Sequence, residues 1–296
     1  YYELILGILI YMQQETVHAE ILSGEKWAEV DDPNDLRVAE FMFNEEARPA
    51  ILSDGFGGYW NYNILDFAFI RNMYFPTPAV LSEMRNSLPH LLYNYGSRQA
   101  ILDTKMAWFL LCEPAHVHAL GGASQIYPVL RERLAGQNVL IPRPTFGEYT
   151  RIFPEALTYG DSVGLHPEEI EAQASSCRVV VFVNPNNPTG TALASTWIAD
   201  FAGRHRQALV IVDESFIEFS SVGSIMPLCD RAGLENVVVV KSLSKSMGMP
   251  GLRLGYVYSR DHEFMSFVGD RIPIWNMNSL AEFTLEQVSE FSGYAG

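Results

Sequence analysis

The chain has 296 residues, of which 48% are hydrophobic, and a formal net charge of −15 at pH 7. This composition can fill one large hydrophobic core or two moderate ones, and it excludes an intrinsically disordered chain. The negative charge argues against nucleic acid and anionic membranes as partners, because both would repel the protein.

The three cysteines, Cys112, Cys177 and Cys229, lie far apart in the sequence and have no metal-binding or redox spacing. That usage predicts a reducing, cytoplasmic compartment. The longest early apolar run, residues 4–11, is too short to cross a bilayer and has no basic flank. We therefore predict no membrane helix, no signal peptide and no metal site.

The first 44 residues are predicted to be a separate segment. Residues 1–14 have a helical pattern that starts without a capping residue, so we expect this chain to be part of a longer one. In the acidic turn DDPND, Asp32 and Asp35 are typical of residues that cap the start of a helix. Residues 45–54, EEARPAILSD, are predicted to be a linker.

The order of elements in residues 1–44, together with Trp27 and the acidic turn, resembles the closing segment of sugar-phosphate and phosphocholine-type nucleotidyltransferases. The resemblance places Asp31 where such enzymes can hold a catalytic metal. We expect the nucleotide-binding glycine loop of such an enzyme to lie outside this chain. We therefore interpret the segment as the tail of a domain and favour the capping role for its acidic turn.

Residues 55–117 are predicted to be an aromatic N-terminal arm followed by helices at 79–92 and 98–112. From residue 118 onward, helical and strand patterns alternate, which predicts a mostly parallel sheet with helices on both faces. The predicted strands are 138–141, 178–183, 208–212 and 236–240, and the predicted helices are 124–135, 146–153, 167–174 and 195–206.

Lys245 follows a run of four valines, Val237 to Val240, that predicts a buried central strand. Its amine would therefore lie at the carboxyl end of that strand, where open α/β sheets bind their ligands. The serines and glycines around it suit an anion, and Arg253 adds a permanently charged guanidinium. A reactive lysine beside a phosphate-shaped site predicts pyridoxal phosphate as the cofactor.

Two further strands end in polar residues. RVVVFVNPNNPTG, residues 178–190, runs into a turn that contains Asn187, and ALVIVDESFIEF, residues 208–219, contains Asp213. An aspartate at the end of a buried strand requires a cation, such as a protonated pyridine nitrogen. The Asn187 amide could then donate to the ring oxygen of the cofactor.

NPNNPTG, DESFIEF and SLSK followed by PGLRLGY together resemble the aminotransferase class I/II family of pyridoxal-phosphate enzymes, fold type I, and within it histidinol-phosphate aminotransferases and threonine-phosphate decarboxylases. The resemblance covers roughly residues 55–285. It implies an α/β fold with a mostly parallel sheet of the seven-stranded type, and a cofactor-binding large domain at 118–280. Residues 281–296 would begin a long interdomain helix. We expect the C-terminal small domain, which supplies the arginine for the substrate carboxylate in this family, to lie outside the chain.

The resemblance implies a role for each matching residue. Lys245 would form the internal aldimine with pyridoxal 5'-phosphate, Asp213 would pair with the pyridine nitrogen, and Asn187 would bind the ring oxygen. Ser242 and Arg253 would hold the phosphate. Lys245 and Asp213 are therefore the predicted catalytic residues.

Further cofactor contacts follow from the same resemblance. Gly122, Ala123 and Ser124 lie in a glycine-containing loop at a helix start, where backbone N–H groups and the helix dipole favour a phosphate. Phe146 would stack on the pyridine ring. Tyr95 resembles the tyrosine that reaches the phosphate of the neighbouring subunit, which implies a homodimer.

The reaction depends on which bond of the substrate is broken. Phe216, assigned to the cofactor site, occupies a position where aminotransferases commonly have tyrosine, and Trp275 resembles the decarboxylase form. We therefore slightly favour decarboxylation over transamination, on an amino acid that bears a phosphate or phosphonate. Two alternatives stay open: a nucleotidyltransferase fusion in which this part is a scaffold, and a non-catalytic cofactor-binding module.

Overall fold

The structure is a computed structural model and describes residues 2–13, 16–18, 20–21, 23–55, 57–162 and 164–290. The chain forms two compact units, Tyr1–Phe69 and Ile70–Gly296. No helix in the described ranges is long and apolar enough to cross a membrane.

The first unit contains short helices. Asp32 caps one of them: its carboxylate accepts the backbone N–H groups of Asn34, at 2.7 Å, and Asp35, at 3.0 Å. The Asp35 side chain accepts the N–H of Asp32 in return, which completes a capping box. The capping interpretation of the acidic turn is therefore confirmed. Most of the segment predicted to be a linker, residues 45–54, is helical instead, because it forms part of helix α3. The helices of this unit are α1 (Tyr2–Tyr11), α2 (Pro33–Phe43), α3 (Arg48–Gly55) and the 3-10 turn η1 (Tyr59–Asn61).

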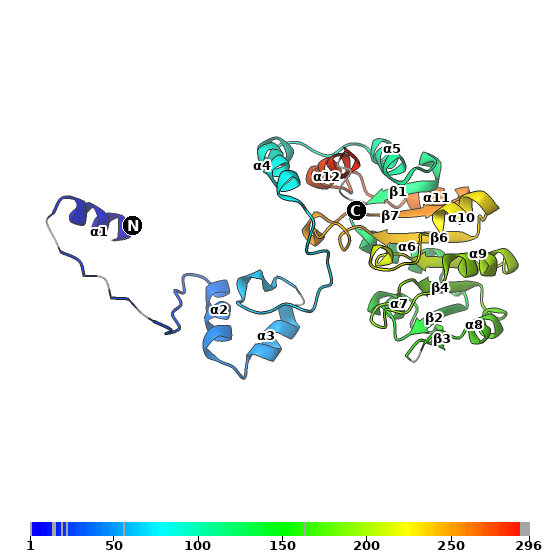
Figure 1. The fold of residues 1–296 in the computed structure, drawn as a ribbon, viewed down its shortest axis with the longest axis horizontal. Coiled ribbons are helices and arrows are strands. Elements are labelled where there is room, and N and C mark those ends of the chain that lie inside the picture. Colours follow the sequence, from blue (N-terminus) through cyan, green and yellow to red (C-terminus); the bar gives the residue numbers. More distant parts are fainter. Residues whose placement is uncertain are drawn as a thin grey trace. The chain divides into compact units, whose positions relative to one another are not determined.

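The second unit is built on a seven-stranded sheet with the order β1-β7-β6-β5-β4-β2-β3 (Figure 1). The strands β3, β2, β4, β5 and β6 pair in parallel, whereas β7 runs antiparallel to both β6 and β1. The predicted α/β fold with a mostly parallel sheet is confirmed. The strands are β1 (Val117–Leu120), β2 (Val139–Arg143), β3 (Leu157–Gly160), β4 (Val179–Val183), β5 (Leu209–Asp213), β6 (Val237–Ser242) and β7 (Gly255–Ser259).

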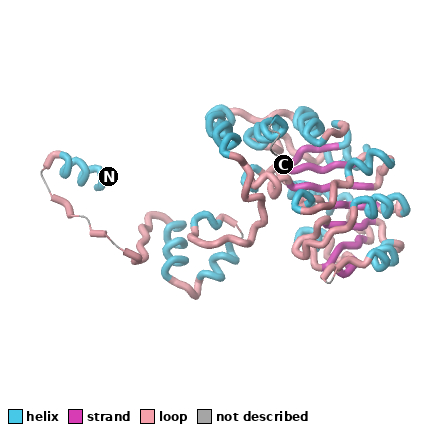
Figure 2. The backbone as a smooth tube through the Cα atoms, viewed as in Figure 1, coloured by secondary structure: helices cyan, strands magenta, loops and turns pink. Residues whose placement is uncertain are grey.

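Helices cover both faces of this sheet, as Figure 2 shows with helices in cyan and strands in magenta. Helices α6, α7 and α11 contribute to the core on one face, and α5, α8, α9, α10 and α12 to the core on the other. The helices of this unit are α4 (Pro78–Leu92), α5 (Gln99–Leu110), α6 (Ile126–Arg133), α7 (Gly147–Ile152), α8 (Pro167–Ala174), α9 (Ser195–Arg204), α10 (Met226–Ala232), α11 (His262–Gly269) and α12 (Ser279–Glu290).

The strands alternate between these two cores with a period of two residues. In β5, Val210 and Val212 join the core under α9 and α10, while Ile211 joins the core under α6 and α7. Each fully buried side chain of this size stabilises the fold by about 1.5–3 kcal/mol. Asp213 follows Ile211 by two residues, so it points towards α6 and α7.

His118 in β1 connects three elements through its ring. Its Nδ1 lies 2.8 Å from Oδ2 of Asp103 in α5, and its Nε2 lies 2.9 Å from the carbonyl oxygen of Met265 in α11. Both partners are acceptors, so only the doubly protonated ring can donate to both. Burial alone would lower the pKa of His118, but the hydrogen bond and charge of Asp103 and the bond to Met265 outweigh burial and raise it.

We predict that His118 makes the stability of this unit depend on pH. The pKa of His118 is raised in the folded protein above an unfolded value of about 6.5. Its contribution is therefore fully present below about pH 6.5 and is lost as the pH rises through the folded pKa. His118→Gln should lower the free energy of unfolding most at low pH, as measured by urea denaturation at a series of pH values. The exposed His90→Gln is the control, and an equal loss for His118→Gln at every pH would contradict this prediction.

Candidate active site

Three neighbouring parallel strands bring the predicted site residues to one edge of the sheet. Strand β4 ends at Val183 next to Asp213, the last residue of β5, and Asp213 lies beside Val240 of β6. The turn with Asn187 follows β4, and the loop with Lys245 follows β6. The ends of β4, β5 and β6 therefore form the candidate active site, at the carboxyl edge where open α/β sheets bind ligands.

Asp213 is a buried carboxylate held by neutral donors. It is 2% exposed, and its Oδ2 accepts the hydroxyl of Tyr149 at 2.9 Å and that of Tyr127 at 3.4 Å. Its Oδ1 accepts the backbone N–H of Ser215 at 3.0 Å. Burial raises the pKa of Asp213, while the hydrogen bonds from Ser215 and Tyr149 and the charge of Lys245 oppose that rise. A carboxylate fixed in this way offers a strong site for a cationic group.

Lys245 differs from the other three lysines of the chain. Lys26, Lys105 and Lys241 each place their Nζ within ion-pair distance of a glutamate carboxylate. In the part of the chain that the structure describes, the Lys245 amine has neither a hydrogen bond nor an ion pair. It is therefore the lysine whose amine is available to a ligand.

The surroundings of Lys245 favour its neutral amine. Burial lowers the pKa of Lys245, and the charge of Arg253 lowers it further, whereas the charge of Asp213 opposes this shift. Asp213 ends β5 beside β6, Lys245 follows β6 by three residues, and Arg253 precedes Gly255, the partner of Ser242 in β7, by two. The three residues therefore lie at the same edge of the sheet. A neutral amine is the nucleophilic form of lysine, so these surroundings would favour attack of Lys245 on a carbonyl.

Arg253 and the loop at Gly122 form a cradle. The Arg253 Nη2 donates to Oγ of Ser124 at 3.0 Å, and it lies 2.6 Å from the place where a Cβ on Gly122 would be. Gly122 also has a φ of +91°, so glycine is required there for two reasons. The backbone of Ala123 lies close to β7, because a Cβ on Gly255 would be 2.7 Å from the backbone nitrogen of Ala123. Guanidinium, hydroxyl and backbone N–H groups that converge in this way suit a phosphate.

Two buried serines, Ser242 and Ser244, lie at the end of β6 and just after it. The backbone N–H of Ser242 donates to Oγ of Ser215 at 3.1 Å, which ties the end of β6 to the residue that holds Asp213. The Oγ of Ser244 is buried without a partner in the described ranges. A buried hydroxyl without a partner is destabilising, so Ser244 has hydrogen-bonding capacity for a bound group. These residues fit a cofactor that carries both an aldehyde and a phosphate.

The arm before α4 fixes the backbone of the Lys245 loop. The backbone N–H of Asn72 donates to the carbonyl of Lys245 at 2.8 Å, and its side-chain amide donates to the carbonyl of Ser246 at 2.9 Å. Gly248 has a φ of +62°, and a Cβ there would lie 2.1 Å from the carbonyl oxygen of Phe75. The loop and the arm are thus in direct backbone contact, which holds the lysine in place.

The other predicted residues lie less centrally. The Phe146 ring is 6.1 Å from that of Tyr127, so it borders the Asp213 group. The Phe216 ring lies 6.2 Å from that of Phe219, and Tyr95 is exposed and stacks on Trp275 at 4.3 Å. Over the described residues, no hydrogen bond joins Asn187, Phe216 or Tyr95 to Lys245 or Asp213. Their roles stay predictions.

Sequence analysis missed the two tyrosines that hold Asp213. Tyr149 lies in the motif PTFGEY, three residues after Phe146, and Tyr127 lies in α6. Both are aromatic residues in apolar helical patterns, which predict only core packing. Their position on the face of the sheet under Asp213 becomes visible only when β5 is placed.

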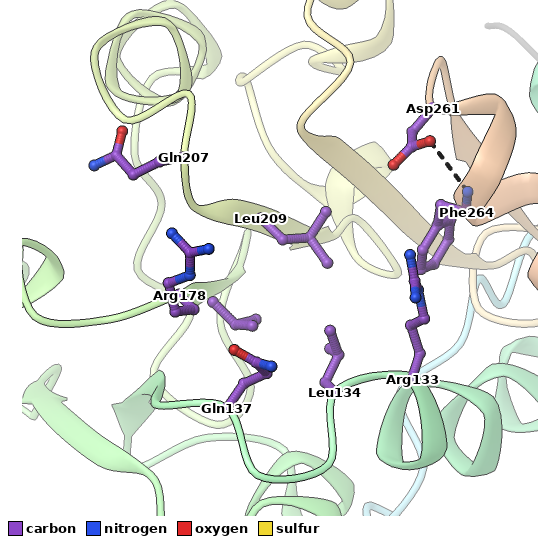
Figure 3. Close-up of a pocket in the computed structure, with 9 residues that line it drawn as sticks. Arg133, Leu134, Gln137, Arg178, Gln207, Leu209, Asp261 and Phe264 are labelled. Carbon is purple, nitrogen blue, oxygen red and sulfur yellow. Dashed lines mark hydrogen bonds between the residues drawn. The ribbon is translucent and has the colours of Figure 1, made fainter.

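A separate cavity of about 290 Å³ lies at the opposite edge of the sheet (Figure 3). Its wall includes Val179 and Leu209, the first residues of β4 and β5, whereas the candidate site lies at the last residues of these strands. Figure 3 shows Arg178, Gln137 and Leu209 around it, and it contains none of the predicted site residues. It plays no part in the chemistry of the candidate site.

Comparison with known proteins gives a consistent result. The family described as aminotransferase class I and II matches residues 71–290. A CMP-5'-(3-aminopropyl)phosphonate synthase of Streptomyces rubellomurinus is 34% identical over 283 residues, which are 91% of this chain and 44% of that protein. An L-serine phosphate decarboxylase of Sulfurospirillum multivorans is 29% identical over 216 residues, 68% of this chain and 54% of that protein.

The fold is shared with solved structures. The crystal structure of an L-threonine-O-3-phosphate decarboxylase from Porphyromonas gingivalis aligns with a TM-score of 0.67 and 22% identity, covering 78% of this chain and 70% of that one. At this identity the likeness establishes the fold alone. The chain spans about half the length, or less, of the first curated relatives that it matches.

We predict that Lys245 titrates at a lower pH than Lys105. The pKa of Lys245 is lowered by burial and by Arg253, whereas the pKa of Lys105 is raised because Glu282 and Glu286 outweigh its burial. Labelling of the cofactor-free protein with a small amine reagent at a series of pH values, followed by peptide mass spectrometry, gives each midpoint. Arg253→Ala should move the Lys245 midpoint upward. A Lys245 midpoint above that of Lys105 would contradict the prediction.

Proposed function

Because this chain belongs to the aminotransferase class I and II family, we propose that it uses Lys245 and pyridoxal 5'-phosphate to decarboxylate an amino acid that bears a phosphate or phosphonate. The single observation that carries the proposal is the shared site of Lys245, Asp213 and Arg253, in which the lysine amine has no ion-pair partner among the described residues.

Pyridoxal 5'-phosphate is the cofactor of this family, and when bound it draws electrons from the substrate Cα into its protonated ring. The cradle of Gly122, Ser124 and Arg253 would hold the phosphate. Asp213, held by Tyr149, would favour the proton on the ring nitrogen because its charge favours a cationic ring. Lys245 provides the amine for covalent attachment.

Lys245 also has the properties of a general base and acid. Its pKa is lowered by burial and by Arg253, which brings it closer to the operating pH. In a decarboxylation, the bond between Cα and the carboxylate carbon breaks, carbon dioxide leaves, and a proton must be added at Cα. A protonated Lys245 would deliver that proton.

The preference for decarboxylation has two supports. Phe216 brings no hydroxyl to the position where transaminases commonly have tyrosine. The name of the Streptomyces relative contains a 3-aminopropyl group, an amine without a carboxylate, and the Sulfurospirillum relative is named a serine phosphate decarboxylase. Loss of the carboxylate from an α-amino acid leaves an amine without a carboxylate, as in the 3-aminopropyl group. The same names support a substrate with a phosphate or phosphonate.

We further propose that the active site forms in a homodimer. Tyr95 is 77% exposed and stacks on Trp275, and nearby in the sequence Trp108 is 71% and Leu111 92% exposed. Large apolar side chains that remain exposed are typical of a surface for a protein partner. A second copy that covers these residues would allow Tyr95 to reach the phosphate of the neighbouring site.

The remaining assignments are also proposals. The three cysteines are free, which agrees with a reducing cytoplasm. Residues 1–44 are proposed to be the tail of a nucleotidyltransferase domain, with the cofactor-binding domain at 118–280. The CMP in the name of the Streptomyces relative is compatible with a nucleotidyl transfer in a longer protein.

Replacement of Lys245 tests the attachment. We expect the protein with pyridoxal phosphate to be yellow, borohydride to fix the cofactor on the peptide with Lys245, and Lys245→Ala to lose the yellow absorbance while remaining folded. Turnover should fall by more than about a hundredfold, because the proton-transfer group is lost. Lys26→Ala, in the first unit, is the control and should match the wild type. Retained yellow absorbance in Lys245→Ala would rule out this role.

Product analysis tests the reaction. The purified protein should release carbon dioxide from one or more of a panel of phosphoserine, phosphothreonine and amino acids with a phosphonate group, without a keto-acid acceptor. The panel is assayed in parallel with 2-oxoglutarate to detect amino transfer. A keto-acid product that depends on the acceptor would replace decarboxylation by transamination. Cofactor binding without any turnover would favour a binding module.

A further inference from the structure

Asp161 is a fully buried carboxylate that directly follows β3. It is 0% exposed, and its backbone N–H donates to the carbonyl of Arg143 at 2.9 Å. Its carboxylate accepts the side chains of three residues of one turn: the amide of Asn186 at 2.5 Å, the hydroxyl of Thr189 at 3.1 Å, and the hydroxyl of Thr191 at 2.6 Å. No cation contacts this carboxylate within the described residues.

These contacts show what the Asp161 carboxylate does in the fold. A buried carboxylate without a cation is costly unless several donors satisfy it. All three side-chain donors come from residues 186–191, the turn NNPTGT after β4. The Asp161 carboxylate therefore holds that turn in place through three side-chain hydrogen bonds.

The turn is also fixed at its other contacts. Asn184, which lies between β4 and the turn, donates its backbone N–H to the carbonyl of Asp213 at 2.8 Å. The Asn186 amide donates a second time, to the carbonyl of Pro144 at 2.8 Å, and its oxygen accepts the hydroxyl of Thr145 at 3.2 Å. One asparagine thus joins Asp161, the turn after β4 and the turn after β2.

Both joined turns contain a predicted cofactor contact. Phe146 directly follows Thr145, and Asn187 directly follows Asn186. The side chain of Asn187 is half-buried and has no hydrogen bond in the described part of the chain, so its amide is available to a ligand. The backbone on both sides of it is held, because Asn186 binds Asp161 before it and Thr189 binds Asp161 after it.

We propose that Asp161 is a positioning residue of the active site, which fixes Asn187 against the ring oxygen of the cofactor and keeps the Phe146 turn at a set distance. This inference rests on the function proposed above. It assigns a role to a residue that contacts neither cofactor nor substrate. Displacement of a contacting group by about 1 Å can cost about a hundredfold in rate, so a rigid turn has a direct catalytic value.

The test compares variants that differ only in the Asp161 network. Asp161→Asn keeps the shape of the side chain but replaces an acceptor by a donor. Thr191→Val removes the hydroxyl that contacts Asp161 and keeps the shape, while Thr191→Ser keeps the hydroxyl and is the matched control. Asn187→Ala removes the proposed contact itself and sets the size of the effect.

The readout is the pH at which the visible absorbance of the bound cofactor changes, measured with the cofactor affinity of each variant. A donor to the ring oxygen favours its negatively charged form, so loss of that donor moves the transition to higher pH. We expect Asn187→Ala, Asp161→Asn and Thr191→Val to move it upward, and Thr191→Ser to match the wild type. Asp161→Asn combined with Asn187→Ala should move it no further than Asn187→Ala alone, because both changes act through one contact.

A structural role alone would give a different result. Asp161→Asn and Thr191→Val would then lower the melting temperature but leave the transition at the wild-type pH while Asn187→Ala moves it, and the inference would be overturned. If Asp161→Asn does not fold, the pair Thr191→Val and Thr191→Ser decides on the same readout. A wild-type protein that gives no cofactor absorbance would instead overturn the proposed function, and this inference with it.

Discussion

The buried carboxylate of Asp213 is the constraint on which the active site depends. It is the last residue of a central strand whose neighbouring strands are rich in buried valines. Two tyrosine hydroxyls and a backbone N–H donate to it, and none of them carries a positive charge. Burial raises the pKa of Asp213, so a cation that approaches it would favour its anionic form. The charge of Lys245, which follows the neighbouring strand β6, opposes that rise. A bound cofactor would present its protonated ring nitrogen to Asp213 and its aldehyde to Lys245.

The rest of the site is arranged around that carboxylate by backbone contacts. Asn72 donates hydrogen bonds to the backbone of the Lys245 loop, and the absence of a side chain at Gly122 allows Arg253 to approach. After β4, the backbone N–H of Asn184 donates to the carbonyl of Asp213. The contacts of Asn72 and of the turn after β4 fix main chain, so Lys245 and Asn187 start from rigid backbone positions. Preorganisation of this kind is what a cofactor enzyme contributes to the chemistry of its cofactor.

The sequence was informative where function and strand pattern coincide. The valine runs predicted β4, β5 and β6, and the polar residues at their ends predicted Asp213 and Lys245. The strands β1, β3 and β7 were not predicted, because VHAL, LTYG and GYVYS are short and mix polar with apolar residues. Tyr149 and Asp161 were also missed, since their partners lie 64 and 25 residues away and long-range hydrogen bonds leave no local pattern.

A crystal structure of the protein grown with pyridoxal 5'-phosphate tests the account most directly. We predict continuous density from Nζ of Lys245 to the cofactor, the ring nitrogen within hydrogen-bonding distance of Asp213, and the phosphate between Arg253 and Ser124. A cofactor bound elsewhere, or a ring whose nitrogen faces away from Asp213, would contradict the central claim that these residues form one site.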